Sequence, residues 1–190
     1  MDQLLRSIDW NFVEVSVLRV FAVLLCLTVH EACHGLAAYA LGDPTAREER
    51  RLSLNPLRHI DWLGLAMMLF AGFGWAKPVP VDPRHFQKPK QGMALTALAG
   101  PVSNFVLAFL AILLNFAVLE NWITYDGCPA HRLYLWLHFQ VAPLSIGLGL
   151  FNLLPIPPLD GAKVLGAFLP DRTYFALMRY ERYGILLLLA

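Results

Sequence analysis

The sequence predicts an all-α polytopic membrane protein that forms a single domain over residues 1–190. Of these residues, 57% are hydrophobic and only 15% are charged, whereas about 25% are charged in a typical soluble domain. The apolar residues gather into runs of the length that crosses a bilayer, which takes roughly 20 consecutive apolar residues. The net charge of +1 provides no basic face of the kind that nucleic-acid binding requires.

Three apolar runs are long enough to span the membrane, and we expect them to form the core of the domain over residues 15–161. They cover residues 15–41, 93–119 and 133–159. The first run ends at Gly42-Asp43-Pro44, where two helix-breaking residues lie close together. The second run has no charged residue. The third run ends in several prolines, which must open the helix near the membrane boundary and free backbone groups that need partners.

Shorter segments fill the rest of the pattern. Residues 63–76 are apolar but too short for a full span, and two glycines interrupt them, so we expect a re-entrant or interfacial segment. A C-terminal helical segment closes the chain with a partial span at 183–190, which stops without a polar flank. We therefore expect the chain to be cut short there. Weak alternation of apolar and polar residues at 51–55 suggests a short strand. We expect residues 77–89 to be extended because of their prolines.

The positions of lysine and arginine predict the orientation, because cytoplasmic loops are enriched in these residues. The loops after the first run and before the second, and the tail after the third, hold four basic residues each. The N-terminus and the loop at 120–132 hold one each. We therefore expect a multi-pass protein of the cell membrane with its N-terminus outside and its three basic segments in the cytoplasm. No cleavable signal peptide is expected, because acidic residues interrupt the basic start that such peptides need.

The first run contains the motif His30-Glu31-Ala32-Cys33-His34. On a helix, residues four apart lie one turn above each other, so the two imidazoles can bind one Zn²⁺. Glu31 can then act as a general base on a metal-bound water. Ionisable groups inside a spanning helix are costly and tend to mark function. The alternative is that both histidines only bond to neighbouring helices, which would leave Glu31 in need of its own partner.

Catalytic zinc sites usually have three protein ligands and a water. Asp160 is a candidate for the third ligand, because it follows the proline-broken end of the third run and precedes Gly161, where the backbone can turn. It could equally be a turn or N-cap residue of the next segment. The predicted orientation places His34 and Asp160 toward the cytoplasmic ends of their helices, so the two can meet. Histidines in the polar loops, such as His59, are expected to be solvated.

Three ordered motifs resemble those of the site-2 protease family of intramembrane zinc metalloproteases, peptidase family M50. The first is residues 30–35, the second is Ala99-Gly100-Pro101-Val102-Ser103-Asn104, and the third is residues 152–161, Asn-Leu-Leu-Pro-Ile-Pro-Pro-Leu-Asp-Gly. Residues 74–81, Gly-Trp-Ala-Lys-Pro-Val-Pro-Val, are similar to the spacer of the short bacterial and archaeal members, which lack appended domains.

The resemblance implies one Zn²⁺ per chain, held by His30, His34 and Asp160. It implies that Glu31 activates the water, and that Asn104 and Asn152 hold the substrate backbone or the developing oxyanion. The same amides could instead bond to neighbouring helices.

The activity implied is that of a zinc metalloendopeptidase that hydrolyses peptide bonds within the transmembrane segments of membrane proteins. Such an enzyme serves regulated intramembrane proteolysis or signal-peptide clearance. Its partners would be the transmembrane helix of a substrate protein and the lipid bilayer. The sequence carries no indication of the oligomeric state.

Overall fold

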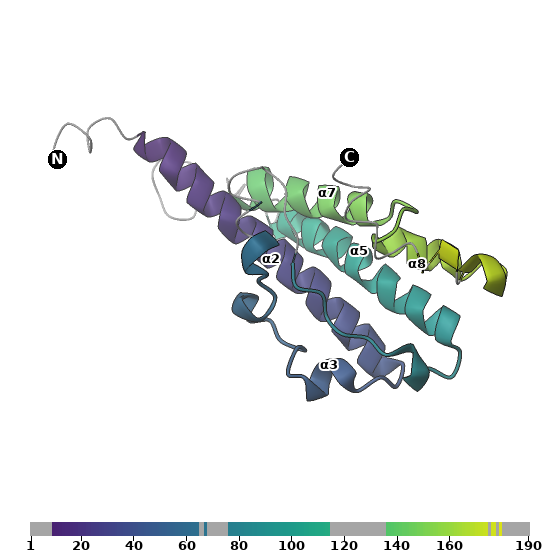
Figure 1. Cartoon of the computed structure of the whole chain (residues 1–190). Helices are drawn as coiled ribbons and strands as arrows, with labels where there is room; N and C mark the ends of the chain where they lie inside the picture. Colours follow the sequence, from purple (N-terminus) through teal and green to yellow (C-terminus); the bar gives the residue numbers. More distant parts are fainter. Residues whose placement is uncertain are drawn as a thin grey trace.

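The computed structural model describes residues 9–64, 67, 76–114, 136–174, 176–177 and 179. Two long helices dominate it, α2 (Trp10–Ala40) and α5 (Pro89–Leu114). A shorter helix, α7 (Ala142–Asn152), packs on α5, and so does α8 (Asp160–Gly166). Helix α5 therefore lies at the centre of the arrangement, between α2 on one side and α7 and α8 on the other (Figure 1).

Helices α2 and α5 are both long and apolar enough to cross a membrane. With 31 residues, α2 reaches about 46 Å, which exceeds the roughly 30 Å hydrocarbon core of a bilayer. It begins five residues before the predicted start of the first run, because the Asp9 carboxylate accepts hydrogen bonds from the amides of Asn11 and Phe12 and caps the helix. The first predicted span is thus helical except for its last residue, Leu41, and the second is helical over its described residues, 93–114; residues 115–119 lie outside the described part of the chain.

The helices meet through small side chains and leave their large apolar side chains exposed. The buried cluster between α2, α5 and the start of α7 consists of Ala22, Cys26, Ala108, Ala111, Val141 and Ala142. Small residues at such contacts let membrane helices approach closely. Phe21, Phe109 and Leu110 are each more than half exposed, which suits a surface covered by lipid and would be costly in water.

The third predicted span is only partly helical. A π-helical stretch, η4 (Leu137–Val141), continues into α7, which ends at Asn152. Residues 153–159 form turns, with a cis peptide bond between Pro157 and Pro158. Proline cannot donate a helical hydrogen bond, so the helix ends seven residues before the predicted boundary. Within the part of the chain that the structure describes, two helices rather than three meet the length and composition expected of a span.

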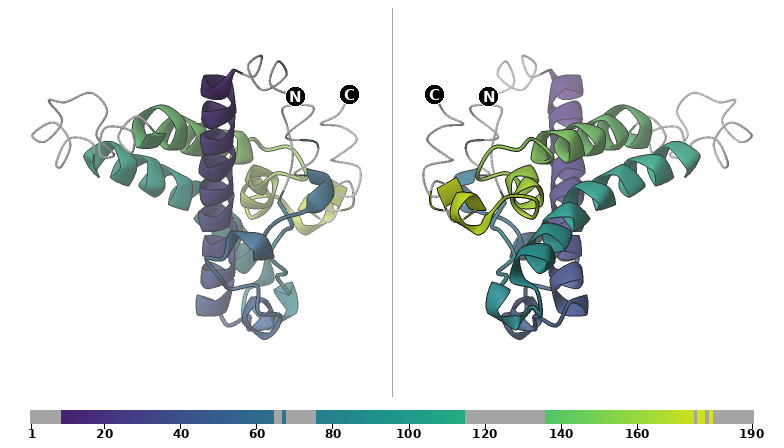
Figure 2. Two further views of the ribbon diagram at one scale, coloured as in Figure 1. Left: turned by 90° about the vertical axis from the view of Figure 1, so that its left-hand side faces the viewer. Right: turned by 90° about the vertical axis from the view of Figure 1, so that its right-hand side faces the viewer.

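The connector between α2 and α5 is largely irregular. It contains α3 (Thr45–Glu48), η1 (Pro56–Arg58) and η2 (Pro83–His85), and it lies around the C-terminal half of α2 (Figure 2). The prediction of a strand at 51–55 is wrong, because polar side chains there bond to the local backbone instead: Ser53 accepts from the Asn55 amide, and Asn55 caps η1.

In the described residues, strand-like pairing is limited to one antiparallel bridge between Ile60 and Ala76. This bridge joins Ala76, the last residue of the predicted re-entrant segment, to Ile60, which lies three residues before that segment begins. Most of residues 63–76, and all of 183–190, lie outside the described part of the chain.

Candidate metal centre

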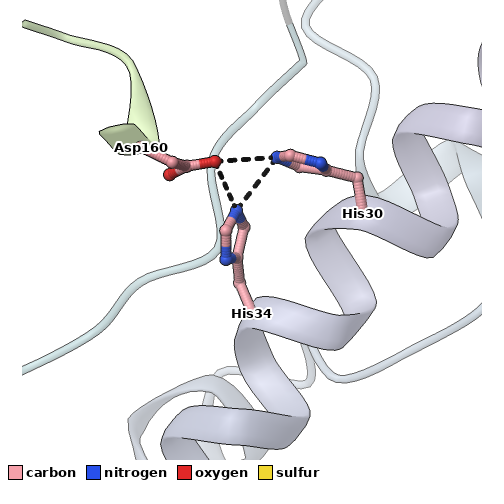
Figure 3. A group of neighbouring side chains, drawn as sticks. All are labelled: His30, His34 and Asp160. Carbon is pink, nitrogen blue, oxygen red and sulfur yellow. Dashed lines mark hydrogen bonds and ion pairs between the residues drawn. The ribbon is translucent and has the colours of Figure 1, made fainter. Parts of the chain in front are cut away.

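Three side chains from distant parts of the chain meet at one point (Figure 3). His30 and His34 project from one face of α2, and their Nε2 atoms lie 3.0 Å apart. Asp160, the first residue of α8, brings its Oδ2 atom to 3.1 Å from each of these nitrogens. All three residues are buried, with exposed fractions of 4%, 9% and 8%. The arrangement is a nearly equilateral triangle of potential ligand atoms.

The triangle fits a zinc ion. Two imidazoles and one carboxylate are a common donor set of catalytic zinc sites, and ligand atoms bound tetrahedrally at about 2.0 Å lie about 3.3 Å apart. The observed separations of 3.0–3.1 Å are close to that value. Three protein ligands also leave a fourth position for a water. In the described residues, His30, His34 and Asp160 form the group of side chains able to hold a metal.

Helix α5 contacts the far side of both imidazoles. Nδ1 of His34 lies 2.7 Å from the carbonyl oxygen of Thr96, so its N–H donates to that oxygen. Nδ1 of His30 lies 3.0 Å from the side-chain amide of Asn104. The carboxamide oxygen of Asn104 is buried and has no hydrogen-bond partner among the described residues.

A rotation that exchanges the nitrogen and oxygen of the Asn104 carboxamide would give Nδ1 of His30 a hydrogen-bond acceptor. Its nitrogen and oxygen are nearly indistinguishable in shape, and the hydrogen-bond network decides their placement. After rotation, the oxygen accepts the Nδ1 proton of His30. Each imidazole then has its Nδ1 proton held by α5 and its Nε2 lone pair directed at the triangle, which is the tautomer that a metal ligand needs.

Gly100 lies on α5 midway between Thr96 and Asn104, at a spacing of four residues on either side. A Cβ atom at this position would lie 2.5 Å from Nε2 of His34 and 2.6 Å from Cε1 of His30. Such distances are far shorter than any van der Waals contact. Only glycine lets the backbone of α5 pass this close to the two imidazoles.

Glu31 lies beside the histidines and is held by the connector. Its Oε2 atom accepts a hydrogen bond of 2.9 Å from the Val79 amide. A cavity of about 380 Å³ opens here; its walls comprise His30, Glu31, His34, Pro78, Val79, Val81, Met93, Thr96, Ala97, Asn152, Pro158, Asp160 and Lys163. The carboxylate and the three candidate ligands thus share one cavity, which is large enough for part of a peptide.

The two asparagines occupy different places. Asn152 forms part of the cavity wall, and its amide nitrogen donates to the Leu148 carbonyl within its own helix. Asn104 is fully buried beneath His30 and lies outside the cavity lining.

Several contacts of the site were not predicted from the sequence. The Thr96 carbonyl and the Val79 amide are backbone groups, so the type of residue at these positions does not predict their contacts with His34 and Glu31. Lys163 lines the cavity and follows Asp160 by three residues, a helical spacing that could have indicated a shared face. The expectation that His59 is solvated is wrong: it is 2% exposed, and its Nε2 lies 2.7 Å from the Ser53 carbonyl.

Comparisons with known proteins agree on one family. The model of peptidase family M50 matches residues 130–188. YwhC of Bacillus subtilis is 37% identical over 174 residues, covering 90% of this chain and 77% of the relative. Rip2 of Mycolicibacterium smegmatis is 30% identical over 182 residues, covering 93% of this chain and 67% of the relative. The assigned names of both relatives are those of zinc metalloproteases.

No solved structure matches the chain. The relative from Bacillus subtilis nevertheless aligns with this chain across all three motifs, because the match covers 90% of the sequence. The chain belongs to peptidase family M50, the site-2 protease family that its three motifs resemble.

Proposed function

We propose that this protein is an intramembrane zinc endopeptidase that hydrolyses peptide bonds within the transmembrane segments of other membrane proteins. The observation that carries the proposal is the triangle of two Nε2 atoms and one carboxylate oxygen, with a further carboxylate in the same cavity. Pure metal storage would not need that further carboxylate. The substrates would be segments cut in regulated intramembrane proteolysis or remnant signal peptides.

His30, His34 and Asp160 would hold one Zn²⁺ per chain. When bound, the ion lowers the pKa of a coordinated water and polarises the scissile carbonyl. The buried Nδ1 contacts of the two histidines fix their rings, so that the ligand geometry exists before the substrate arrives.

Glu31 would be the general base and then the general acid. Its carboxylate takes a proton from the attacking water while the new C–O bond forms at the scissile carbon. The same carboxyl then delivers that proton to the amide nitrogen as the C–N bond breaks. Both transfers need Glu31 to face the cavity, which it does.

The two asparagines would serve separate steps. Asn152 stands in the cavity wall, where its amide can donate to the substrate backbone or to the oxyanion. Asn104 lies behind His30 and would act on the ligand rather than on the substrate. Its carboxamide oxygen would hold the His30 tautomer.

The substrate would have to unwind to be cut, because helical carbonyls are already hydrogen-bonded. It would approach through the lipid along the exposed apolar faces of α2, α5 and α7. The basic residues of the connector support an orientation with the N-terminus outside and the active site toward the cytoplasmic side of the cell membrane.

The decisive experiment compares the wild type with Glu31→Gln. Both proteins are purified in detergent, assayed for zinc by mass spectrometry, and incubated with a panel of single-span helical substrates. We expect about one zinc per chain in both and cleavage within the helix by the wild type alone. Equal zinc with no cleavage by either protein would favour a metal-binding scaffold. A wild type without zinc would overturn the assignment of the ligands.

A further inference from the structure

The carboxylate of Glu31 is held by a peptide group from another part of the chain. The N–H of Val79 donates to Oε2 of Glu31 at 2.9 Å. The carbonyl of the same peptide group belongs to Pro78, and Nη2 of Arg51 donates to it at 3.2 Å. One planar peptide unit therefore has the Glu31 carboxylate at its N–H end and the Arg51 guanidinium at its C=O end.

Arg51 fixes more than this one carbonyl. Its Nη2 also donates to the Lys77 carbonyl at 2.7 Å, and its Nη1 donates to the Arg58 carbonyl. A planar guanidinium with several donors in a fixed geometry suits such a role, which a lysine ammonium could not fill in the same way. Arg51 thereby ties the segment before α5 to the loop that follows α3.

The segment is also seated on α2 by packing. A Cβ placed on Gly35 would lie 3.3 Å from Cγ1 of Val79, so the Val79 side chain covers the glycine one turn after Glu31. Val79 is 8% exposed. Prolines at 78 and 80 keep the backbone extended on both sides of it. The Val79 amide consequently has little freedom to leave the carboxylate.

We propose that Arg51 is a positioning residue for Glu31 and acts through the Pro78–Val79 peptide group. The guanidinium polarises the Pro78 carbonyl and thereby strengthens the hydrogen bond from the Val79 N–H to the Glu31 carboxylate, because linked hydrogen bonds reinforce one another. With Oε2 held in this way, Oε1 is left to take the proton of the attacking water. The inference rests on the proposed function of Glu31 as a base, but the contact itself can be tested without activity.

Kinetics provide the first test. Arg51→Met should retain zinc and a similar KM, while kcat falls by about 10- to 100-fold, the range expected when a reacting group is displaced by about 1 Å. Arg51→Lys should restore part of kcat, because an ammonium can reach one carbonyl but not three. Arg50→Met, which removes the neighbouring exposed charge, is the matched control and should behave as the wild type.

A second pair of variants acts on the peptide group itself. Val79→Pro removes the N–H, whereas Val79→Ala keeps it and trims the side chain. We expect Val79→Pro to lower kcat as Arg51→Met does, and Val79→Ala, which keeps the N–H but loses the packing on Gly35, to lower kcat less. The double variant Arg51→Met/Val79→Pro should be no worse than the more damaged single variant, because both changes remove the same restraint. Losses that multiply would overturn the proposal.

Hydrogen exchange tests the contact without any cleavage assay. The prolines at 78 and 80 leave the Val79 amide as the one exchanging group between Lys77 and Val81. Its exchange should be about tenfold faster in Arg51→Met and in Glu31→Ala than in the wild type, as expected when a hydrogen bond is lost. An unchanged rate in Arg51→Met would overturn the proposal, whatever the rate in Glu31→Ala. A wild type that fails to cut any substrate overturns the proposed function instead, and leaves the exchange result to decide the contact.

Discussion

Oδ2 of Asp160 lies 3.1 Å from Nε2 of His34, although the two residues come from α8 and α2 and the whole of α5 and α7 separates them in the sequence. The aspartate reaches the imidazole because α7 ends at Asn152 and the turns at 153–159 redirect the chain. The candidate third ligand thus depends on the prolines that end α7.

Replacement of Asp160 by asparagine should weaken zinc binding by at least about 100-fold, more than the loss of a supporting residue costs. The amide keeps the shape of the carboxyl group but carries no charge to offset that of the metal. Competition with a chromogenic chelator measures the affinity. Retention of wild-type affinity would show that Asp160 is only an N-terminal residue of α8.

Gly100→Ala should disrupt the metal site. The added Cβ would lie 2.5 Å from Nε2 of His34, so one of the two helices must move, at a cost of about 1–3 kcal/mol. Zinc content and thermal stability in detergent should both fall. Gly147→Ala is the control, because a Cβ there meets no atom within 4 Å; alanine favours a helix, so this variant should be at least as stable as the wild type.

Substitutions of Asn104 and Asn152 should differ in their effects on zinc affinity and on kcat. Asn104→Leu removes the acceptor for Nδ1 of His30 and should weaken zinc binding by about 10- to 100-fold, with activity recovering at high zinc. Asn104→Asp keeps an acceptor and should retain the metal. Asn152→Leu should bind zinc as the wild type does and lose kcat. Normal zinc affinity with a low kcat in Asn104→Leu would instead support a role for Asn104 at the oxyanion.

Asp43 should make the stability of the connector depend on pH. Its carboxyl, which is fully enclosed, accepts hydrogen bonds from Thr45 and, at 2.7 Å, from the Asp82 amide; His85 lies 3.0 Å away. Burial by itself raises the pKa of Asp43, but the hydrogen bonds from Thr45 and Asp82, together with His85, outweigh it and hold the pKa below the ordinary 3.8.

A lowered pKa in the folded state means that the carboxylate stabilises the protein at pH values above about 4, and that this contribution is lost as the pH falls through the native pKa. Asp43→Asn should therefore lower the free energy of unfolding by about 1–3 kcal/mol at neutral pH and by less near pH 3. Melting temperatures recorded in detergent from pH 3 to 7 check this. A constant difference between wild type and variant across that range would contradict it.

Length and hydrophobicity were sufficient to locate α2 and α5, because a spanning helix needs only a long apolar run. The end of α7 was predicted seven residues too late, since the sequence around Asn152 stays apolar although the prolines have already stopped the helix. The strand at 51–55 was inferred from a few alternating residues, and local side-chain bonds overrode that weak pattern.

The residues of the candidate site also differ in how far the sequence alone predicts their contacts. His30 and His34 could be paired from their spacing alone, because helix geometry dictates which residues are neighbours. The predicted orientation allowed His34 and Asp160 to meet, but only the resemblance to known motifs favoured a ligand role for Asp160 over a turn or N-cap role, since no local rule connects α2 with α8. The role of Val79 could not be foreseen, because a backbone amide is present at almost every position and only the folded connector selects one of them.

Helix α8 begins with Asp160 and packs on α5, and this order along the chain has a consequence for biosynthesis. While the ribosome is still making the first two long helices, the nascent protein has two imidazoles and a glutamate in the membrane but no third ligand. The candidate metal site would be complete only after Asp160 had been synthesised and α8 had docked. Under the proposed function, a newly inserted chain would therefore be unable to cut its neighbours until Asp160 had been synthesised and α8 had docked on α5.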